Sequence, residues 1–312
     1  MTKPLRIGTR GSPLALWQAH FVRDRLLALD PRRPIELVEI QTEGDLVRDV
    51  PLVQLGGQGA FTKAIQKALL DNRADVAVHS LKDLPTFAVE GLMLAAVPER
   101  GPSGDAFVSK KHSSFAGLPT GATVATSSLR RRAQLLHRRR DLKLIDMRGN
   151  VETRLSKLTA QNLDAIVLAE AGLVRLGLTE RITEILDRAW MLPAVGQGAL
   201  GLECRTDDSE TRSLVERLNH VETHSAVLAE RAMLRGLGGG CQVPIGAASS
   251  VRHDTLTLCG VVLPPDGKRR IEAEVSGPLD EPEIMGEELA GVLLARGAAE
   301  LLQHDDPASR GA

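Results

Sequence analysis

The first forty residues constrain the fold most, because they predict a strand, a helix and a second strand in succession. Residues 5–9 and 35–40 are short, mainly apolar stretches typical of strands. Between them, Ser12 and Pro13 match a helix N-cap followed by proline at the first helical position. Pro31 ends the helical pattern. A strand–helix–strand succession is the unit of a sheet with helical crossovers, so the pattern predicts an α/β fold.

A second α/β pattern follows a glycine- and proline-bearing connection at residues 99–104, which we interpret as a hinge. Its predicted strands are residues 122–126, 142–147 and 164–169. Residues 193–201 predict a crossing that returns the chain to the first part. After Gly246, three consecutive strands and a closing helix indicate a small α+β domain. The domains expected are therefore residues 1–99 with 199–217, residues 104–193, and residues 218–312.

Composition narrows the classes of protein. A length of 312 residues exceeds the usual size of a domain with a single hydrophobic core, so more than one domain is expected. A content of 43% hydrophobic residues and a net charge of -1 indicate an ordinary globular chain. The near-neutral charge argues against nucleic-acid binding. Three scattered cysteines are too few for a disulfide framework or a zinc site, so we predict no metal. Without a signal peptide or a membrane-length apolar run, we expect a cytoplasmic protein that binds no membrane.

Cys241 lies in a glycine-rich loop at residues 238–246, with Pro244 after it. Three successive glycines allow positive φ angles and a close approach of other groups to the backbone. A bulky group can therefore reach this thiol. Free cysteines are more often buried and inert, and reactivity also requires a lowered pKa. The loop by itself leaves both interpretations open.

Lys82 and Asp83 follow His79 at the end of the strand predicted at residues 75–80, and Pro85 restricts the turn. A neighbouring lysine and aspartate on a surface contribute little energy, so a plain surface turn is one interpretation. Loops at strand ends carry chemistry in α/β folds, and this position favours a functional role.

Arginine greatly outnumbers lysine, since nine of the 39 basic residues are lysine. Genome base composition is one explanation, and recognition of carboxylates or phosphates by the guanidinium fork is the other. Arg130 and Arg131 favour the second explanation, because positive charge in the first turn of a helix opposes the helix dipole. Further polar residues at predicted strand ends and helix starts are Arg10, Ser12, Thr126, Ser127, Ser128, Arg148, Gly149, Arg154 and Arg175.

Six motifs occur in order along the chain, at residues 9–15, 79–85, 126–131, 148–151, 192–198 and 239–246. Together they resemble the porphobilinogen deaminase (hydroxymethylbilane synthase) family, and the resemblance covers essentially the whole chain. It implies two lobes like those of type II periplasmic binding proteins, plus a C-terminal domain with the cysteine. It also implies a monomeric transferase of tetrapyrrole and heme biosynthesis. Such an enzyme joins four porphobilinogens head to tail, releases ammonia at each addition, and frees hydroxymethylbilane with water.

The resemblance also implies roles for individual residues. Cys241 carries a dipyrromethane cofactor through a thioether, and Asp83 is the catalytic carboxylate. The cofactor or substrate contacts it implies are Arg10, Ser12, Phe61, Lys82, Thr126, Ser127, Ser128, Arg130, Arg131, Arg148, Gly149, Arg154, Arg175 and Gln197. Gln58 departs from the family pattern, which often has lysine there, and this puts a charged lid in doubt.

Two other functions compete with this interpretation. A solute-binding protein for an anionic ligand would explain the arginines but not the Cys241 loop. A hydrolase with a cysteine nucleophile would need a histidine placed to activate the thiol, and a sequence does not reveal such a pairing. A covalent adduct on the purified chain would separate the deaminase from both.

Overall fold

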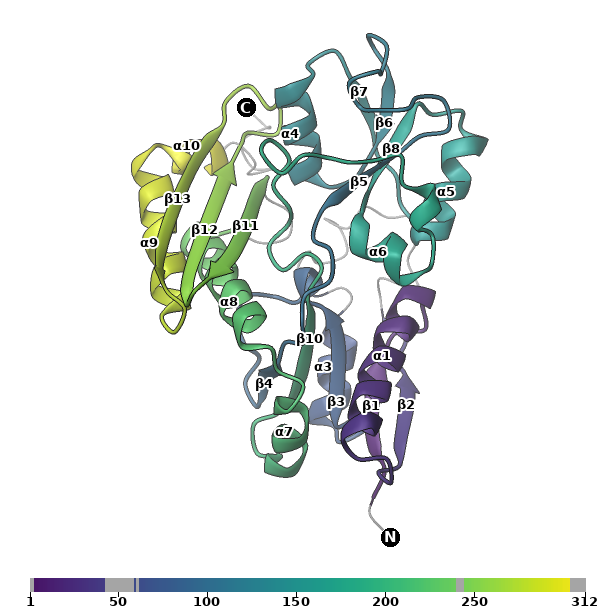
Figure 1. Ribbon diagram of the computed structural model, residues 1–312, viewed down its shortest axis with the longest axis vertical. Helices are drawn as coiled ribbons and strands as arrows, with labels where there is room; N and C mark the ends of the chain where they lie inside the picture. Colours follow the sequence, from purple (N-terminus) through teal and green to yellow (C-terminus); the bar gives the residue numbers. More distant parts are fainter. Residues whose placement is uncertain (1–2, 43–58, 60–61, 240–243, 304–312) are drawn as a thin grey trace, which may run out of the picture. The chain divides into compact units, whose positions relative to one another are not determined.

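The computed structural model describes residues 3–42, 59, 62–239 and 244–303 of the chain. The fold divides into two compact units (Figure 1). Unit 1 comprises Met1–Gly101 and Gly198–His224, and unit 2 comprises Pro102–Gln197 and Ser225–Ala312. The chain therefore passes between the units three times: at the predicted hinge, directly after Gln197, and after His224.

Unit 1 is built around a five-stranded sheet in the order β2-β1-β3-β10-β4. The first three strands are parallel, whereas β10 runs antiparallel to both of its neighbours. A core that includes Ile7, Val22 and Leu202 joins the sheet to α1. The elements are β1 (Leu5–Thr9), α1 (Pro13–Leu29), β2 (Ile35–Glu39), α3 (Lys63–Leu70), β3 (Val76–Ser80), η2 (Leu81–Asp83), β4 (Leu92–Ala96), β10 (Leu200–Arg205) and α7 (Ser209–Glu216).

Unit 2 begins with a second five-stranded sheet, in the order β7-β6-β8-β5-β9. Here β5 is the antiparallel strand, paired with β8 on one side and β9 on the other. The elements are β5 (Asp105–Val108), β6 (Thr123–Ala125), α4 (Leu129–Arg138), β7 (Lys143–Ile145), α5 (Val151–Ala160), β8 (Ala165–Ala169), α6 (Glu170–Arg175), η3 (Thr179–Arg181) and β9 (Glu184–Ile185).

The two sheets share one plan that the sequence does not display as a repeat. In each sheet, three parallel strands lie side by side and the next strand is antiparallel to them. The chain forms this antiparallel strand directly after it crosses from the other unit. In unit 1 it is β10, which comes last in the chain among the strands of its sheet, and in unit 2 it is β5, which comes first. The antiparallel strand thus comes last in one sheet and first in the other. For this reason the sequences of the two sheets do not align residue by residue.

The C-terminal part of unit 2 is a three-stranded antiparallel sheet with helices (Figure 1). Its elements are α8 (Val221–Gly236), β11 (Ile245–Arg252), β12 (Thr255–Val262), β13 (Ile271–Pro278), α9 (Pro282–Ala295) and α10 (Ala298–Gln303). The first turn of α8, up to His224, still belongs to unit 1. Its own core includes Met233, Leu258 and Leu289. A smaller cluster of Ala133 and Leu192 with Val261 and Leu263 packs this sheet against α4.

The predicted fold class is confirmed: two α/β sheets and a small C-terminal α+β part. The division into three domains stays a prediction, since the compact units number two and the second contains both of its sheets. In the part of the chain that the structure describes, no helix is both long and apolar enough to span a membrane.

Candidate active site

Lys82 and Asp83 lie in a single 3-10 turn, η2, directly after β3. Leu81 anchors the turn: its side chain is buried and its backbone N–H donates to the carbonyl of Ala199 at 3.1 Å. Gly201 on β10 makes room for that anchor, because a Cβ there would lie 2.7 Å from Leu81 Cδ1. Lys82 and Asp83 are half-buried. The turn therefore presents both charges from a rigid base at the carboxyl end of β3, where ligands bind in such sheets.

A buried polar group supports this strand end from within the sheet. His79 Nε2 lies 3.1 Å from Glu203 Oε2, and Gln66 Nε2 donates to Glu203 Oε1 at 3.0 Å. All three residues are at most 5% exposed. Glu203 comes from β10, so the returning strand fixes the strand that carries Asp83.

Ser12 caps α1 as predicted, and its hydroxyl accepts from the N–H of Ala15 at 3.4 Å. Gly11 permits a close approach, since a Cβ there would lie 2.8 Å from Glu39 Oε2. Arg10 is half-buried in the same turn. Arg10, Ser12, Lys82 and Asp83 thus lie in loops that follow β1 and β3, two neighbouring parallel strands of unit 1.

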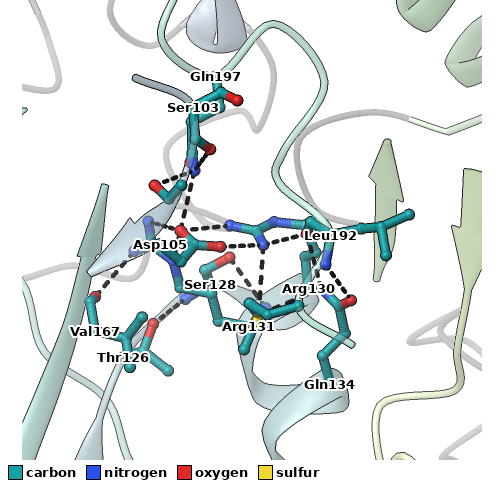
Figure 2. A network of polar contacts seen from close by, with 12 residues as sticks. Ser103, Asp105, Thr126, Ser128, Arg130, Arg131, Gln134, Val167, Leu192 and Gln197 are labelled. Carbon is teal, nitrogen blue, oxygen red and sulfur yellow. Dashed lines mark hydrogen bonds and ion pairs between the residues drawn. The ribbon is translucent and has the colours of Figure 1, made fainter. Parts of the chain in front are cut away.

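In unit 2, Arg130 and Arg131 converge on a single carboxylate, that of Asp105 (Figure 2). Arg130 Nη1 donates to Asp105 Oδ2 at 2.6 Å, and Arg131 Nε donates to Oδ1 at 2.9 Å. Gln197 Nε2 donates to the same Oδ1 at 3.0 Å. Asp105 is 0% exposed, and the two arginines are 4% and 5% exposed.

Charge explains how an acid stays ionised at this depth. Burial by itself would raise the pKa of Asp105, but Arg130, Arg131 and the hydrogen bond from Gln197 hold it well below its ordinary value. Burial lowers the pKa of Arg131, and Asp105 opposes that effect. The cluster therefore contains two guanidinium groups and one carboxylate, which leaves one positive charge uncompensated within it.

The hydroxyl residues before α4 are used locally. Ser128 caps α4 by accepting from the N–H of Arg131 at 3.4 Å. Ser127 Oγ donates to the carbonyl of Met147 at 3.0 Å and accepts from its N–H at 2.9 Å, which ties the ends of β6 and β7 together. Thr126 Oγ1 accepts from the N–H of Ser128 at 3.3 Å.

The loop after β7 is fixed by α5. Gly149 has a φ of 121°, and a Cβ there would lie 2.6 Å from Thr153 Cγ2, so the position requires glycine. Arg154 Nε donates to the carbonyl of Gly149 at 2.8 Å. Arg148 Nη1 is buried without a hydrogen-bond partner in the described structure. Arg175, at the end of α6, is half-buried, and burial lowers its pKa to about 10.

The structure describes two of the three cysteines, Cys204 and Cys259. Burial raises the pKa of Cys204 to about 11. Burial, with a hydrogen bond to Glu272, raises the pKa of Cys259 to about 12. Both thiols are therefore protonated and poorly nucleophilic at neutral pH. Cys241, like Phe61 and Gln58, lies outside the described residues.

Sequence reasoning missed Asp105 and Glu203, the two acids that organise these clusters. The available signal was an acidic residue inside or at the start of an otherwise apolar strand, which requires a buried partner. It also assigned Gln197 to ligand contact, whereas the Gln197 amide is 0% exposed and donates to the carbonyls of Ser103 and Gly104. Contact of Gln197 with a ligand stays a prediction.

Comparison with known proteins identifies the family. The family model for the porphobilinogen deaminase dipyrromethane cofactor binding domain matches residues 5–213, and that for the porphobilinogen deaminase C-terminal domain matches residues 224–295. The chain belongs to the porphobilinogen deaminase family. A porphobilinogen deaminase from Pelobacter propionicus is 50% identical over 301 residues, which are 96% of this chain and 97% of that protein. The predicted family, its transferase class, the polymerisation of porphobilinogen and the dipyrromethane cofactor are thereby confirmed.

Solved structures with a similar fold are distant in sequence. The periplasmic aliphatic sulphonate binding protein SsuA from Escherichia coli is 16% identical, with a TM-score of 0.42 over 75% of this chain and 70% of that chain. A nutrient binding protein from Burkholderia cenocepacia bound to methionine is 14% identical, with a TM-score of 0.42 over 68% and 90%.

Proposed function

We propose that the chain joins four porphobilinogens head to tail into hydroxymethylbilane, and that it elongates the product on a dipyrromethane attached to Cys241. The observation that carries the residue assignment is the arginine pair of α4, which shares one carboxylate within the matched cofactor-binding domain. Porphobilinogen has an acetate and a propionate side chain, so a growing chain accumulates carboxylates. A buried cluster with an uncompensated positive charge suits such a ligand.

The residues present fit the cofactor. Beyond the charge of the arginine pair, Arg130 Nε and Arg148 Nη1 are buried donors without a hydrogen-bond partner among the described residues. Such donors are costly to leave unsatisfied, and a carboxylate would satisfy them. Arg130, Arg131 and Arg148 would therefore hold the cofactor's acid side chains. Arg154, Arg175, Thr126, Ser127, Ser128 and Gly149 complete the proposed contacts in unit 2. When bound, the dipyrromethane supplies the pyrrole end to which substrate is added.

Cys241 is the proposed attachment point because the other two thiols are unsuited to it. A thioether forms from a reactive thiol that a bulky group can reach. The raised pKa values of Cys204 and Cys259 exclude ready thiolate formation there at neutral pH. The glycines around Cys241 favour access.

Asp83 is the proposed catalytic carboxylate. As ammonia leaves porphobilinogen, positive charge develops near the pyrrole nitrogen, and a fixed carboxylate stabilises it. Leu81 and the Glu203 cluster hold η2 in place, so Asp83 is preorganised before substrate arrives. The same carboxylate can accept and return a proton during deamination and coupling. Arg10, Ser12 and Lys82 would bind the incoming acid side chains, and Phe61 and Gln197 are further proposed contacts.

Intact-protein mass tests this proposal. The purified chain should carry an added mass of two porphobilinogens less the ammonia released, and Cys241→Ser should lack it. Cys259→Ser is the matched control and should keep it. An unmodified active protein, or an adduct mapped to Cys204 or Cys259, would refute the attachment at Cys241.

Different arginines should serve different ligands, either the cofactor or the incoming substrate. Arg130→Ala and Arg131→Ala should yield protein without cofactor, whereas Arg10→Ala should carry cofactor and fail in elongation. Each truncation leaves a carboxylate poorly paired, at a cost of roughly 2–5 kcal/mol if the contact is buried. Normal cofactor in Arg130→Ala, or none in Arg10→Ala, would contradict this division.

We also propose, from the family alone, a cytoplasmic monomer that takes porphobilinogen and no nucleic acid. Sedimentation of the purified chain at micromolar and tenfold higher concentration should give one species of monomer mass. A concentration-dependent dimer would reject the monomer.

A further inference from the structure

Asp105 is placed where a ligand-binding edge would be. It is the first residue of β5 and pairs in register with Ala169, the last residue of β8. It therefore lies at the carboxyl edge of the parallel strands, the edge at which ligands bind in such sheets. A buried acid beside a site for anionic ligands is unexpected unless it acts on the groups that bind them.

The arginines that Asp105 holds are in an unfavourable position by themselves. Residues 130 and 131 are neighbours in the first turn of α4, so their side chains leave the helix about 100° apart. Two buried positive charges repel each other, and both oppose the helix dipole. Nevertheless both guanidinium groups converge on one carboxylate (Figure 2).

Backbone carbonyls complete the arrangement. Arg130 Nη1 donates to the carbonyl of Leu192 at 2.6 Å, and Arg131 Nη1 donates to the carbonyl of Val167 at 3.0 Å. Gln134 fixes Leu192 in turn, through hydrogen bonds of 3.0 Å and 2.8 Å. Each arginine is thus aligned between Asp105 and a separate backbone segment.

We propose that Asp105 is a positioning residue for cofactor acquisition: it fixes Arg130 and Arg131 in their binding geometry before any cofactor is present. The proposal rests on the proposed role of the arginine pair toward cofactor carboxylates. Asp105 compensates one charge of the pair and leaves the other for the ligand. The chain then presents a formed carboxylate site and does not have to assemble one against charge repulsion.

The structure provides a matched control in the other unit. Asp75 also pairs with two arginines, Arg6 at 2.7 Å and Arg205 at 3.2 Å. It lies directly before β3, at the amino edge of the strands, away from the edge that carries Lys82 and Asp83. Its loss should cost stability without touching cofactor acquisition.

The experiment measures loading of full-length protein made in cells that lack porphobilinogen. Apo-protein is titrated with porphobilinogen, and intact mass gives the fraction that carries the two-pyrrole adduct. Asp105→Asn keeps the shape but removes the charge, and should raise the half-loading concentration at least about tenfold. Asp75→Asn should lower the melting temperature and load as the wild type does.

Two further variants make each outcome decisive. Asp105→Glu keeps the charge but displaces it, so it should fold and still load more weakly than wild type. If Asp105→Asn does not fold, Asp105→Glu decides, and normal loading by either folded variant would overturn the proposal. Arg131→Gln tests the underlying assignment separately. Weak loading by Arg131→Gln with normal loading by Asp105→Asn rejects only the positioning role, whereas normal loading by Arg131→Gln rejects the proposed function of the pair.

Discussion

Each unit of this protein contains an aspartate that pairs with two arginines, and the two clusters differ in which edge of their sheet they occupy. Asp75 joins Arg6 of β1 to Arg205 of β10, at the amino edge of the unit 1 strands. Asp105 joins two neighbouring residues of α4 at the carboxyl edge of the unit 2 strands. One carboxylate and two guanidinium groups therefore link strands in unit 1, whereas the same kinds of group form a candidate binding site in unit 2.

The comparison shows that composition does not decide the role of such a cluster. In unit 1 the arginines come from two strands that flank β3, so their pairing with Asp75 holds the sheet together. In unit 2 both come from one helix and would repel each other without Asp105. A cluster assembled at a cost, at the edge where ligands bind, favours a functional explanation.

The variant Asp83→Asn should show the largest difference between the two edges of a sheet. Asp83 and Asp75 lie at opposite ends of β3, so their neutral variants should have opposite effects. Loss of one preorganised charge at Asp83 should lower kcat by about 10²–10³ with a near-normal melting temperature. Asp83→Glu keeps the charge and should retain part of the activity.

Asp75→Asn is the control for that measurement, and should keep turnover while melting at a lower temperature. Turnover and melting temperature are measured on both variants. If Asp83→Asn loses activity only in step with stability, the carboxyl edge has no special chemical role.

Glu203→Leu tests the polar cluster that lies between the two edges. It leaves His79 and Gln66 buried without their partner, so the free energy of unfolding should fall by about 1–3 kcal/mol. Urea denaturation measures the change. Glu210→Leu, at an exposed residue of α7, is the control and should change little. An unchanged stability in Glu203→Leu would mean that the cluster does not hold the β3 end.

The stability that the cluster of Asp75, Arg6 and Arg205 contributes should be lost in acid, over a defined range of pH. Burial opposes ionisation of Asp75, yet hydrogen bonds from Arg6 and Arg205 lower its pKa to about 2. Since the folded pKa lies below the unfolded value near 4, its stabilisation is present above about pH 4 and is lost as the pH falls toward 2. The melting temperatures of wild type and Asp75→Asn should therefore converge over that range. Curves that stay parallel would exclude the mechanism.

The smallest expected effects come from the two helix caps, which have the same geometry in the two units. Ser12 and Ser128 each accept the N–H of the residue three positions later, at 3.4 Å in both units. Ser12→Ala and Ser128→Ala should each lower the free energy of unfolding by about 1 kcal/mol. If Ser128→Ala also weakens cofactor loading and Ser12→Ala does not, the cap of α4 contributes to the site through Arg131.

The sequence by itself determined what depends on neighbouring residues. The alternation of strands and helices, the cap at Ser12, the cap at Ser128 and the charged turn at Lys82 and Asp83 all follow from local patterns. The order of the motifs along the chain also determined the family, because each is a short run of specific residues. The arginines of α4 attracted attention for a local reason too, their conflict with the helix dipole.

Only the tertiary structure decided what those arginines contact. Asp105 precedes Arg130 by 25 positions, and Gln197 follows Asp105 by 92, so no local pattern relates them. Their meeting depends on β5 entering the sheet antiparallel, after the chain has crossed between units. The return crossing after Gln197 places β10, and with it Glu203, beside His79. Buried charges find partners across a sheet because desolvation penalises unpaired ones, and that requirement acts on distances in space rather than in sequence.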